Sequence, residues 1–385
     1  MPIRNRIAEL HTDITAWRQD FHAHPELQFD VHRTAGSVAE KLRAFGCDEV
    51  VEGIAKTGVV GVIQGKAPGR TVGLRADMDA LPILEATGLD YASTVPGKMH
   101  ACGHDGHTSM LLGAAQYLAE TRNFAGKVVV IFQPAEEGGG GGRVMCEEGM
   151  MGRFDIDEVY GMHNWPSLRV GEFMIKSGPF FAGTAEFTVT VTGRGGHAAK
   201  PHLAVDPTVA AAHLVTALQT IASRTTNPVE QIVVSVTSFV TASTAYNVIP
   251  PSVELRGTVR TLTDEVRDLA EERFAEVVEH TARAYGCEAS LEYKRNYPVM
   301  ANSEAETDYA NAAAEKVSGT CHPAPFIMGG EDFSYMLNER PGAYILLGNG
   351  DGPDVHTPDY NFNDEAIPYG CSWFIEVVES RLAVD

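Results

Sequence analysis

The sequence has few basic residues and no cluster of them. Its 385 residues include 51 Asp and Glu against 30 Lys and Arg, which gives a formal net charge of -21 at pH 7. Phosphate backbones and anionic membrane surfaces repel such a chain on average, because binding to them depends on Lys and Arg. The charge balance therefore argues against nucleic acid and membrane partners.

Paired cysteines and long apolar runs are also lacking. The six cysteines are spread along the chain without a Cys-x-x-Cys spacing, a pattern that suits a reducing compartment rather than a disulfide framework. No run of eighteen apolar residues occurs, so no membrane-spanning helix is expected. The first ten residues are polar and mixed in charge, unlike a signal peptide, and we therefore predict a cytoplasmic location.

What is present is the composition of a globular protein, 44% hydrophobic and 21% charged, in a chain long enough for two compact units. Residues 1–180 alternate helical and strand patterns, which predicts the first part of an α/β catalytic domain. The expected helices are 6–21, 34–45 and 108–120, and the expected strands are 58–63, 71–74, 127–132 and 158–160. The strand 127–132 is unbroken and apolar, as expected for a strand buried on both faces of a central sheet.

The pattern changes over residues 181–295 and then returns to α/β over 296–385. The strand expected at 185–191 alternates polar and apolar residues, as in an antiparallel sheet with one exposed face, and further strands are expected at 231–239 and 253–261. Asp206-Pro207 is typical of a helix start, and a second helix before Gly286 places Ala270, Phe274, Val277, Val278 and Tyr285 on one face. We expect a three-layer α/β domain with a central mixed sheet, interrupted by a smaller α+β domain of two helices on a four-stranded antiparallel sheet.

The densest group of metal-binding side chains is His100-Ala-Cys102-Gly-His104-Asp105-Gly-His107. Thiolate and imidazole together suit Zn²⁺, with Mn²⁺, Co²⁺ and Ni²⁺ as alternatives. The glycines let the chain turn so that Cys102 and His104 point at one centre. Taken alone the pair is a weak signal, because a single cysteine is more often a small core residue.

Two adjacent carboxylates, Glu136 and Glu137, follow the buried strand 127–132. Sites in α/β sheets form beyond the carboxyl ends of strands, and paired carboxylates are costly to bury unless a cation neutralises them. A solvated acidic turn is the alternative. Two histidines are further candidates: His163, just after the expected strand 158–160, and His356, in a loop near the C-terminus. For each of them a purely structural role is the alternative.

With these motifs the sequence resembles the M20 metallopeptidase-like amidohydrolases, in the branch of hippurate hydrolases, N-acyl-amino-acid amidohydrolases and auxin-conjugate hydrolases. The resemblance covers the whole chain. The matching motifs are His24-Pro-Glu-Leu27, Arg75-Ala-Asp77-Met-Asp-Ala-Leu-Pro82, Met99-His-Ala-Cys102-Gly-His104-Asp105, Pro134-Ala-Glu136-Glu137-Gly138, Gly195-Gly-His197, Pro201-His202, Gly329-Gly-Glu-Asp-Phe333 and His356-Thr-Pro358.

The resemblance implies two divalent metal ions, Mn²⁺ or Zn²⁺ before Co²⁺ or Ni²⁺, and a general base at Glu136. The implied ligands are Cys102, His104, Glu137, His163 and His356. Other branches of the superfamily carry His-x-Asp where this chain has Arg75-Ala-Asp77, so that histidine ligand is absent here. Asp77 is left to orient a ligand.

The resemblance also implies substrate contacts from the inserted domain. His197 matches a histidine that polarises the scissile carbonyl, and Asn247 and Arg260 match an Asn and an Arg that bind the substrate carboxylate. A guanidinium suits that role because it binds a carboxylate through two charge-assisted hydrogen bonds. A surface position on a strand is the alternative for Arg260.

The expected activity is hydrolysis of the amide bond of small N-acyl amino acids, to a carboxylic acid and a free amino acid, through a metal-activated water and Glu136. One alternative is a dipeptidase or short-peptide hydrolase with the same chemistry. Another alternative is an inactive metal-dependent binding protein. The five implied ligands together with Glu136 argue against it, because a protein without activity has no chemical need for all six side chains. The inserted domain is expected to form a homodimer or homotetramer.

Overall fold

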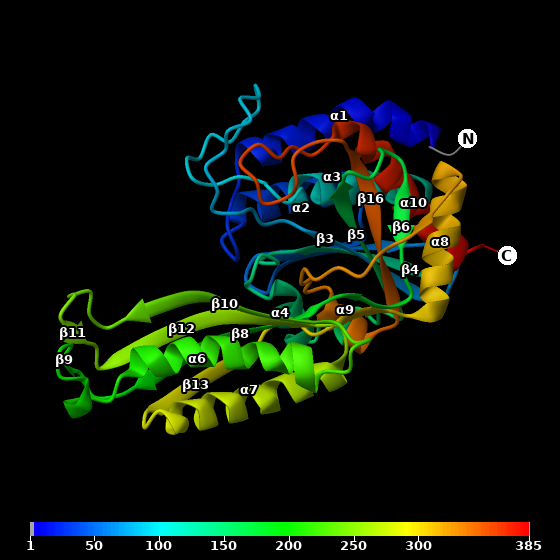
Figure 1. Cartoon of the computed structure of the whole chain (residues 1–385). Coiled ribbons are helices and arrows are strands. Elements are labelled where there is room, and N and C mark those ends of the chain that lie inside the picture. The colour runs from blue at the N-terminus through cyan, green and yellow to red at the C-terminus, as the bar shows by residue number, and fades with distance from the viewer. Residues whose placement is uncertain (1–3, 385) are drawn as a thin grey trace. The chain divides into compact units, whose positions relative to one another are not determined.

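A computed structural model describes residues 4–384. The chain forms two compact units (Figure 1). Unit 1 comprises residues up to Gly178, Ala301–Pro325 and the chain from Asp332 onward, and unit 2 comprises Pro179–Met300 and Phe326–Glu331. Short strands β7 (Gly178–Phe181) and β14 (Met300–Asn302) lie where the chain passes from one unit to the other.

Unit 1 is built on a mixed eight-stranded sheet with the order β1-β2-β4-β3-β5-β16-β6-β15. Strands β3, β4, β5 and β16 are mutually parallel in the middle of this sheet, and β1 and β2 are antiparallel at one side. The strands are β1 (Glu49–Ile54), β2 (Gly58–Gln64), β3 (Thr71–Asp77), β4 (Lys127–Gln133), β5 (Glu158–Pro166), β6 (Phe173–Ile175), β15 (His322–Pro323) and β16 (Gly342–Gly350).

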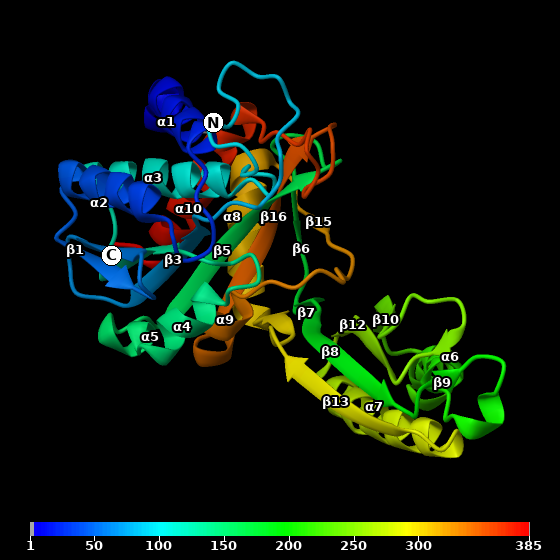
Figure 2. The ribbon, with the colours of Figure 1, turned by 90° about the vertical axis from the view of Figure 1, so that its left-hand side faces the viewer.

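Helices cover both faces of this sheet, which gives three layers (Figure 2). One face carries α1 (Asn5–Ala23), α2 (His32–Phe45), α3 (His104–Thr121), α8 (Glu304–Ser318) and α10 (Ile367–Arg381), and the other carries α4 (Gly141–Glu147), α5 (Met150–Arg153) and α9 (Ser334–Glu339). Burial on both sides explains the continuous apolar run of β4, in which every residue after Lys127 is buried.

Unit 2 contains an antiparallel sheet in the order β10-β12-β8-β13, with α6 and α7 packed on one face (Figure 1). Its elements are β8 (Gly183–Thr192), β9 (Gly196–His197), α6 (Pro207–Thr220), β10 (Ile232–Thr241), β11 (Val248–Ile249), β12 (Ser252–Thr261), α7 (Asp264–Ala284) and β13 (Glu288–Arg295). The Asp206 carboxylate accepts a hydrogen bond from the Thr208 amide and caps α6. The predicted α/β class with an antiparallel α+β unit is confirmed.

Two sequence-based expectations are corrected. Strand β5 runs to Pro166, so His163 lies within a strand rather than after one, because β5 stays paired to β16 from Val159 to Pro166. Tyr285 follows the last residue of α7 and is 38% exposed, stacked on His213 instead of buried with Phe274.

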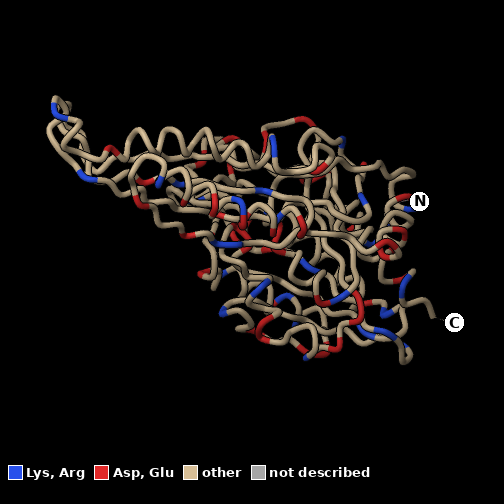
Figure 3. Tube along the Cα trace, turned by 60° about the horizontal axis from the view of Figure 1, so that its bottom comes forward, with Lys and Arg blue, Asp and Glu red and all other residues tan. Residues whose placement is uncertain are grey.

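Charged residues occur in both units. Acidic and basic residues are interspersed along the trace of the chain (Figure 3). No helix within residues 4–384 is both long enough and apolar enough to cross a bilayer.

Candidate metal site

All five predicted ligands and Glu136 lie in unit 1, and the parallel strands explain why. Glu136 and Glu137 follow the carboxyl end of β4, His163 lies near that end of β5, and His356 follows β16. Parallel strands end at one edge of a sheet, so these segments converge there. The prediction that an α/β sheet edge gathers these residues agrees with the structure.

The side chains come together in overlapping triplets. Within each triplet the ligand atoms lie within 4.8 Å of one another. The triplets are Cys102, His104 and His163; Cys102, Glu137 and His356; and His104, Glu136 and Glu137. Sharing of Cys102 and His104 between triplets makes one continuous site.

The two buried histidines are held so that Nε2 faces this site. His104 Nδ1 donates to the main-chain oxygen of Asp79 at 2.8 Å, and His163 Nδ1 donates to that of Asn164 at 2.6 Å. His163 Nε2 lies 3.3 Å from Cys102 Sγ. Within the part of the chain that the structure describes, His104 Nε2 is buried without a hydrogen-bond partner. Nitrogen atoms held in this way are typical of metal-binding histidines.

The electrostatics of the site also fit a cation. Burial raises the pKa of the Cys102 thiol well above its usual range, and the charges of Glu137 and Glu136 raise it further. Burial disfavours protonation of His104, but Asp77 and Asp79 outweigh that effect and raise the pKa of His104 to about 10. Excess buried negative charge is costly unless cations neutralise it. The donor set of thiolate, imidazole and carboxylate therefore fits bound divalent metal ions.

His356 differs from the other four predicted ligands because its side chain is 52% exposed. Its Nε2 lies 3.2 Å from Glu137 Oε1, and its amide donates to the Ala101 oxygen at 2.7 Å. Its φ of +65° is in the left-handed region, which is uncommon for a residue other than glycine and is often found at functional sites.

Sequence reasoning missed a buried chain of hydrogen bonds behind the predicted ligands. Asp77 Oδ1 accepts from His107 Nδ1 at 2.6 Å, and His107 Nε2 accepts from the Asn164 amide at 2.9 Å. The Asn164 side chain then donates to the Cys102 oxygen at 2.6 Å and accepts from the Tyr360 hydroxyl at 2.7 Å. The position of His107 in the same dense motif as Cys102 was the available signal.

Arg75, the first residue of the Arg75-Ala-Asp77 motif, forms buried ion pairs with two carboxylates. Its guanidinium is completely buried and donates to Asp77 Oδ2 at 2.7 Å and to Asp332 Oδ1 at 3.0 Å. Burial opposes the charge of Asp77, but His104, Arg75 and His107 hold the pKa of that carboxyl well below its usual range. Asp77 is hydrogen-bonded to His107, whereas His104 Nε2 lies 3.8 Å from its Oδ2.

The predicted substrate contacts lie in unit 2, and only two of them are neighbours there. His197 is exposed on β9 and pairs with Val248, and the Asn247 oxygen accepts from the Ala198 amide at 3.0 Å. Arg260 is half-buried near the other end of β12.

The register of unit 2 separates Asn247 from Arg260. Ser252 pairs with Thr192 at the end of β8, whereas Arg260 pairs with Thr184 near its start. Eight residue steps along β12 at about 3.4 Å each amount to roughly 27 Å. The β9–β11 pair next to Asn247 lies beyond the Ser252 end of β12 (Figure 1), so Asn247 and Arg260 of one copy do not reach the same carboxylate.

Gly103 joins two predicted ligands and provides a test of the site. Its φ is +90°, and an added Cβ would lie 2.3 Å from Asn164 Nδ2. We expect Gly103→Ala to lower the free energy of unfolding by about 1–3 kcal/mol and to weaken metal binding. Gly97→Ala is the matched control, because Gly97 has a φ of +79° but open space around it. Calorimetry and metal titration of both variants check this, and equal metal affinity in the two would contradict it.

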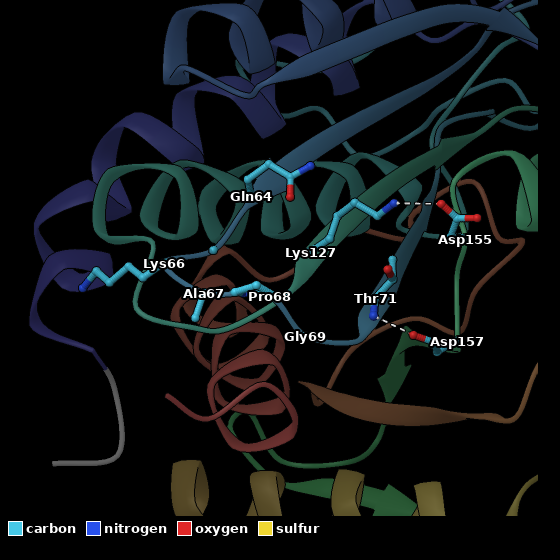
Figure 4. Close-up of a pocket in the computed structure, with 11 residues that line it drawn as sticks. Gln64, Lys66, Ala67, Pro68, Gly69, Thr71, Lys127, Asp155 and Asp157 are labelled. Atoms are coloured by element: carbon cyan, nitrogen blue, oxygen red, sulfur yellow. Dashed lines mark hydrogen bonds and ion pairs between the residues drawn. The ribbon is translucent and has the colours of Figure 1, made fainter. Parts of the chain in front are cut away.

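A separate cavity of about 650 Å³ lies at the opposite end of the sheet (Figure 4). It is lined by the end of β2 and the starts of β3 and β4, including Lys127, whose Nζ lies 3.5 Å from Asp155. None of the predicted ligands lines it. This cavity is distinct from the candidate metal site.

Comparison with known proteins assigns the family. The model of "Peptidase family M20/M25/M40" matches residues 73–380, most of the chain. The chain belongs to the M20/M25/M40 peptidase family. It is a metal-dependent amidohydrolase, as the resemblance in its motifs predicted.

Individual members of the M20 family are similar along their whole length. A hippurate hydrolase of Campylobacter jejuni is 40% identical over 375 residues, 96% of this chain and 97% of that protein. An N-acetyl-L-cysteine deacetylase of Bacillus subtilis is 39% identical over 378 residues, 98% of this chain and 89% of that protein. A crystal structure from Bacillus subtilis, described as a dinuclear metal binding peptidase from the M20 family, has a TM-score of 0.86 and 34% identity and covers 97% of this chain and 99% of its own.

Proposed function

We propose that the protein hydrolyses the amide bond of small N-acyl amino acids, such as hippurate or N-acetyl amino acids, to a carboxylic acid and a free amino acid. The observation that carries this proposal is the position of Glu136, which is 93% buried and shares a triplet with His104 and Glu137. The activities named for the hippurate hydrolase and the deacetylase support the acyl-amino-acid substrate class.

The ligands proposed for two divalent ions, Mn²⁺ or Zn²⁺ before Co²⁺ or Ni²⁺, are Cys102, His104, Glu137, His163 and His356. Such ions, when bound, supply Lewis acidity toward the carbonyl and lower the pKa of water. Glu136 accepts the proton of the attacking water on a carboxylate oxygen and then donates it to the leaving amine nitrogen. His197 is proposed to polarise the scissile carbonyl. Asn247 of one copy and Arg260 of another copy are proposed to bind the carboxylate of the substrate.

A peptide substrate is the second candidate. A protein of Saccharolobus solfataricus named thermostable carboxypeptidase 1 is 38% identical over 351 residues, 90% of this chain. Assays of hippurate and N-acetyl-methionine beside several dipeptides separate the two substrate classes. Faster turnover of dipeptides would replace the first proposal with the second.

We further propose that unit 2 mediates self-association, as a homodimer or homotetramer. Strand β10 is an edge strand of its sheet, and Val233, Phe239 and Val240 on it are 38–54% exposed. An apolar edge strand of ten residues is a template for pairing with a second copy.

We also propose a cytoplasmic location, which the six free cysteines support.

Charge on β10 should abolish that association. We expect light scattering to give the native protein the molar mass of an oligomer, and Phe239→Asp the 41.5 kDa mass of a monomer. Glu288→Lys, at an exposed position on the opposite edge strand β13, is the control and should stay oligomeric. A Phe239→Asp variant with unchanged mass would exclude β10 as the interface.

A further inference from the structure

Asp79 lies two residues beyond the end of β3 and is 99% buried. Its two carboxylate oxygens accept from successive main-chain amides: Oδ1 from Glu136 at 2.9 Å and Oδ2 from Glu137 at 3.1 Å. Its main-chain oxygen accepts from His104 Nδ1 at 2.8 Å. One residue thus contacts the proposed base and two proposed ligands.

The turn after β4 has a conformation that needs such a partner. Ala135 has a φ of +55° and Gly138 one of +82°, and the Glu136 and Glu137 amides point to the same side. Consecutive amides arranged in this way form a concave binding site for an anion. Here the anion is the carboxylate of Asp79, so the turn is held by a side chain of the neighbouring strand's loop.

Asp79 is not placed as a metal ligand itself. Each of its carboxylate oxygens accepts a hydrogen bond from the turn, and Oδ1 also lies 3.5 Å from His104 Nδ1. Asp79 belongs to none of the groups of candidate metal ligands formed by the described residues 4–384. Asp79 therefore acts through other residues.

We propose that Asp79 is the positioning residue of the active site. Its carboxylate sets where the Glu136 and Glu137 side chains begin, and its carbonyl selects the His104 tautomer that leaves Nε2 facing the site. Three separate segments, after β3, after β4 and at the start of α3, are aligned by this one residue. The inference rests on the proposed metal-dependent function of the same side chains.

The test is Asp79→Asn, which keeps the size of the side chain but replaces one acceptor oxygen with an NH₂ group. One of the two amides then faces a donor, and the turn has to move. We expect affinity for Zn²⁺ and Mn²⁺ and the kcat for hippurate to fall about 10–100-fold, with KM changed much less than kcat. The visible spectrum of the Co²⁺-loaded variant should also differ from that of the native protein.

Glu26→Gln is the matched control. The Glu26 carboxylate likewise accepts from two successive amides, those of Arg33 at 3.0 Å and Thr34 at 2.8 Å, at the start of α2. Both variants should lose thermal stability, but only Asp79→Asn should lose metal affinity and kcat. If Asp79→Asn keeps both within two-fold of the native values, or if Glu26→Gln loses them equally, the proposal is wrong.

Hydrogen exchange of the native protein gives a second test that does not depend on a variant folding. We expect the Glu136 and Glu137 amides to be protected even after metal removal, because Asp79 rather than the metal holds them. Exchange as fast as in an open turn would overturn the proposal. Native protein that binds neither Zn²⁺ nor Mn²⁺ and turns over no substrate would instead show that the proposed function itself has failed.

Discussion

Glu136→Gln should reduce kcat by about 10²–10⁴-fold, the usual contribution of a positioned acid–base group, while leaving the metal content unchanged. The amide has the shape of the carboxylate but cannot accept the proton of water. The main-chain amide of Glu136 stays bonded to Asp79, so the turn should keep its conformation. Elemental analysis beside steady-state kinetics measures both quantities.

Glu147→Gln is the control for this variant. Glu147 is the last residue of α4, and its side chain is 66% exposed, 3.8 Å from Arg143. Removing its charge should leave kcat unchanged. If Glu136→Gln retained activity within a few-fold of the native protein, Glu136 would not be the base.

Removal of metal should abolish turnover and lower the thermal stability of the protein. Without cations, the carboxylates of Asp77, Asp79 and Glu137 are gathered around a buried thiol and imidazoles with less positive charge to balance them. Ions that bind only the folded state stabilise it, by about 2.7 kcal/mol at a concentration one hundred times Kd. Dialysis against a chelator, followed by activity assays and calorimetry, measures both effects.

Adding divalent ions back to the metal-free protein completes the experiment. Mn²⁺, Zn²⁺, Co²⁺ and Ni²⁺ added separately to the metal-free protein should restore activity to different extents, and the best of them indicates the native metal. Mg²⁺ is the control, because a site with a thiolate and imidazoles suits softer ions. Full activity in protein shown by elemental analysis to be free of metal would contradict the account.

The sequence allowed prediction of the catalytic sheet edge because the signals there are local. The apolar strand before Glu136 and the cluster around Cys102 could each be recognised within a few residues. Parallel strands then bring their carboxyl ends together. The fold class and the family followed from such short segments.

Long-range contacts explain what was missed. Asp79 was not singled out, because its partners are main-chain amides of residues 57 and 58 positions away, which leave no pattern of side chains. The length of β5 depended on its pairing with β16, nearly two hundred residues later. Asn247 and Arg260 were paired through the family resemblance, but the register of β12 on β8 places them toward opposite ends of unit 2.

The most direct test of the central claim is hydrolysis of hippurate and N-acetyl amino acids by the metal-loaded protein, with the products quantified. We expect equal amounts of carboxylic acid and free amino acid, loss of both products in Glu136→Gln, and slower reaction with dipeptides. Binding of these substrates without release of any free amino acid, by protein that holds its metal, would contradict it.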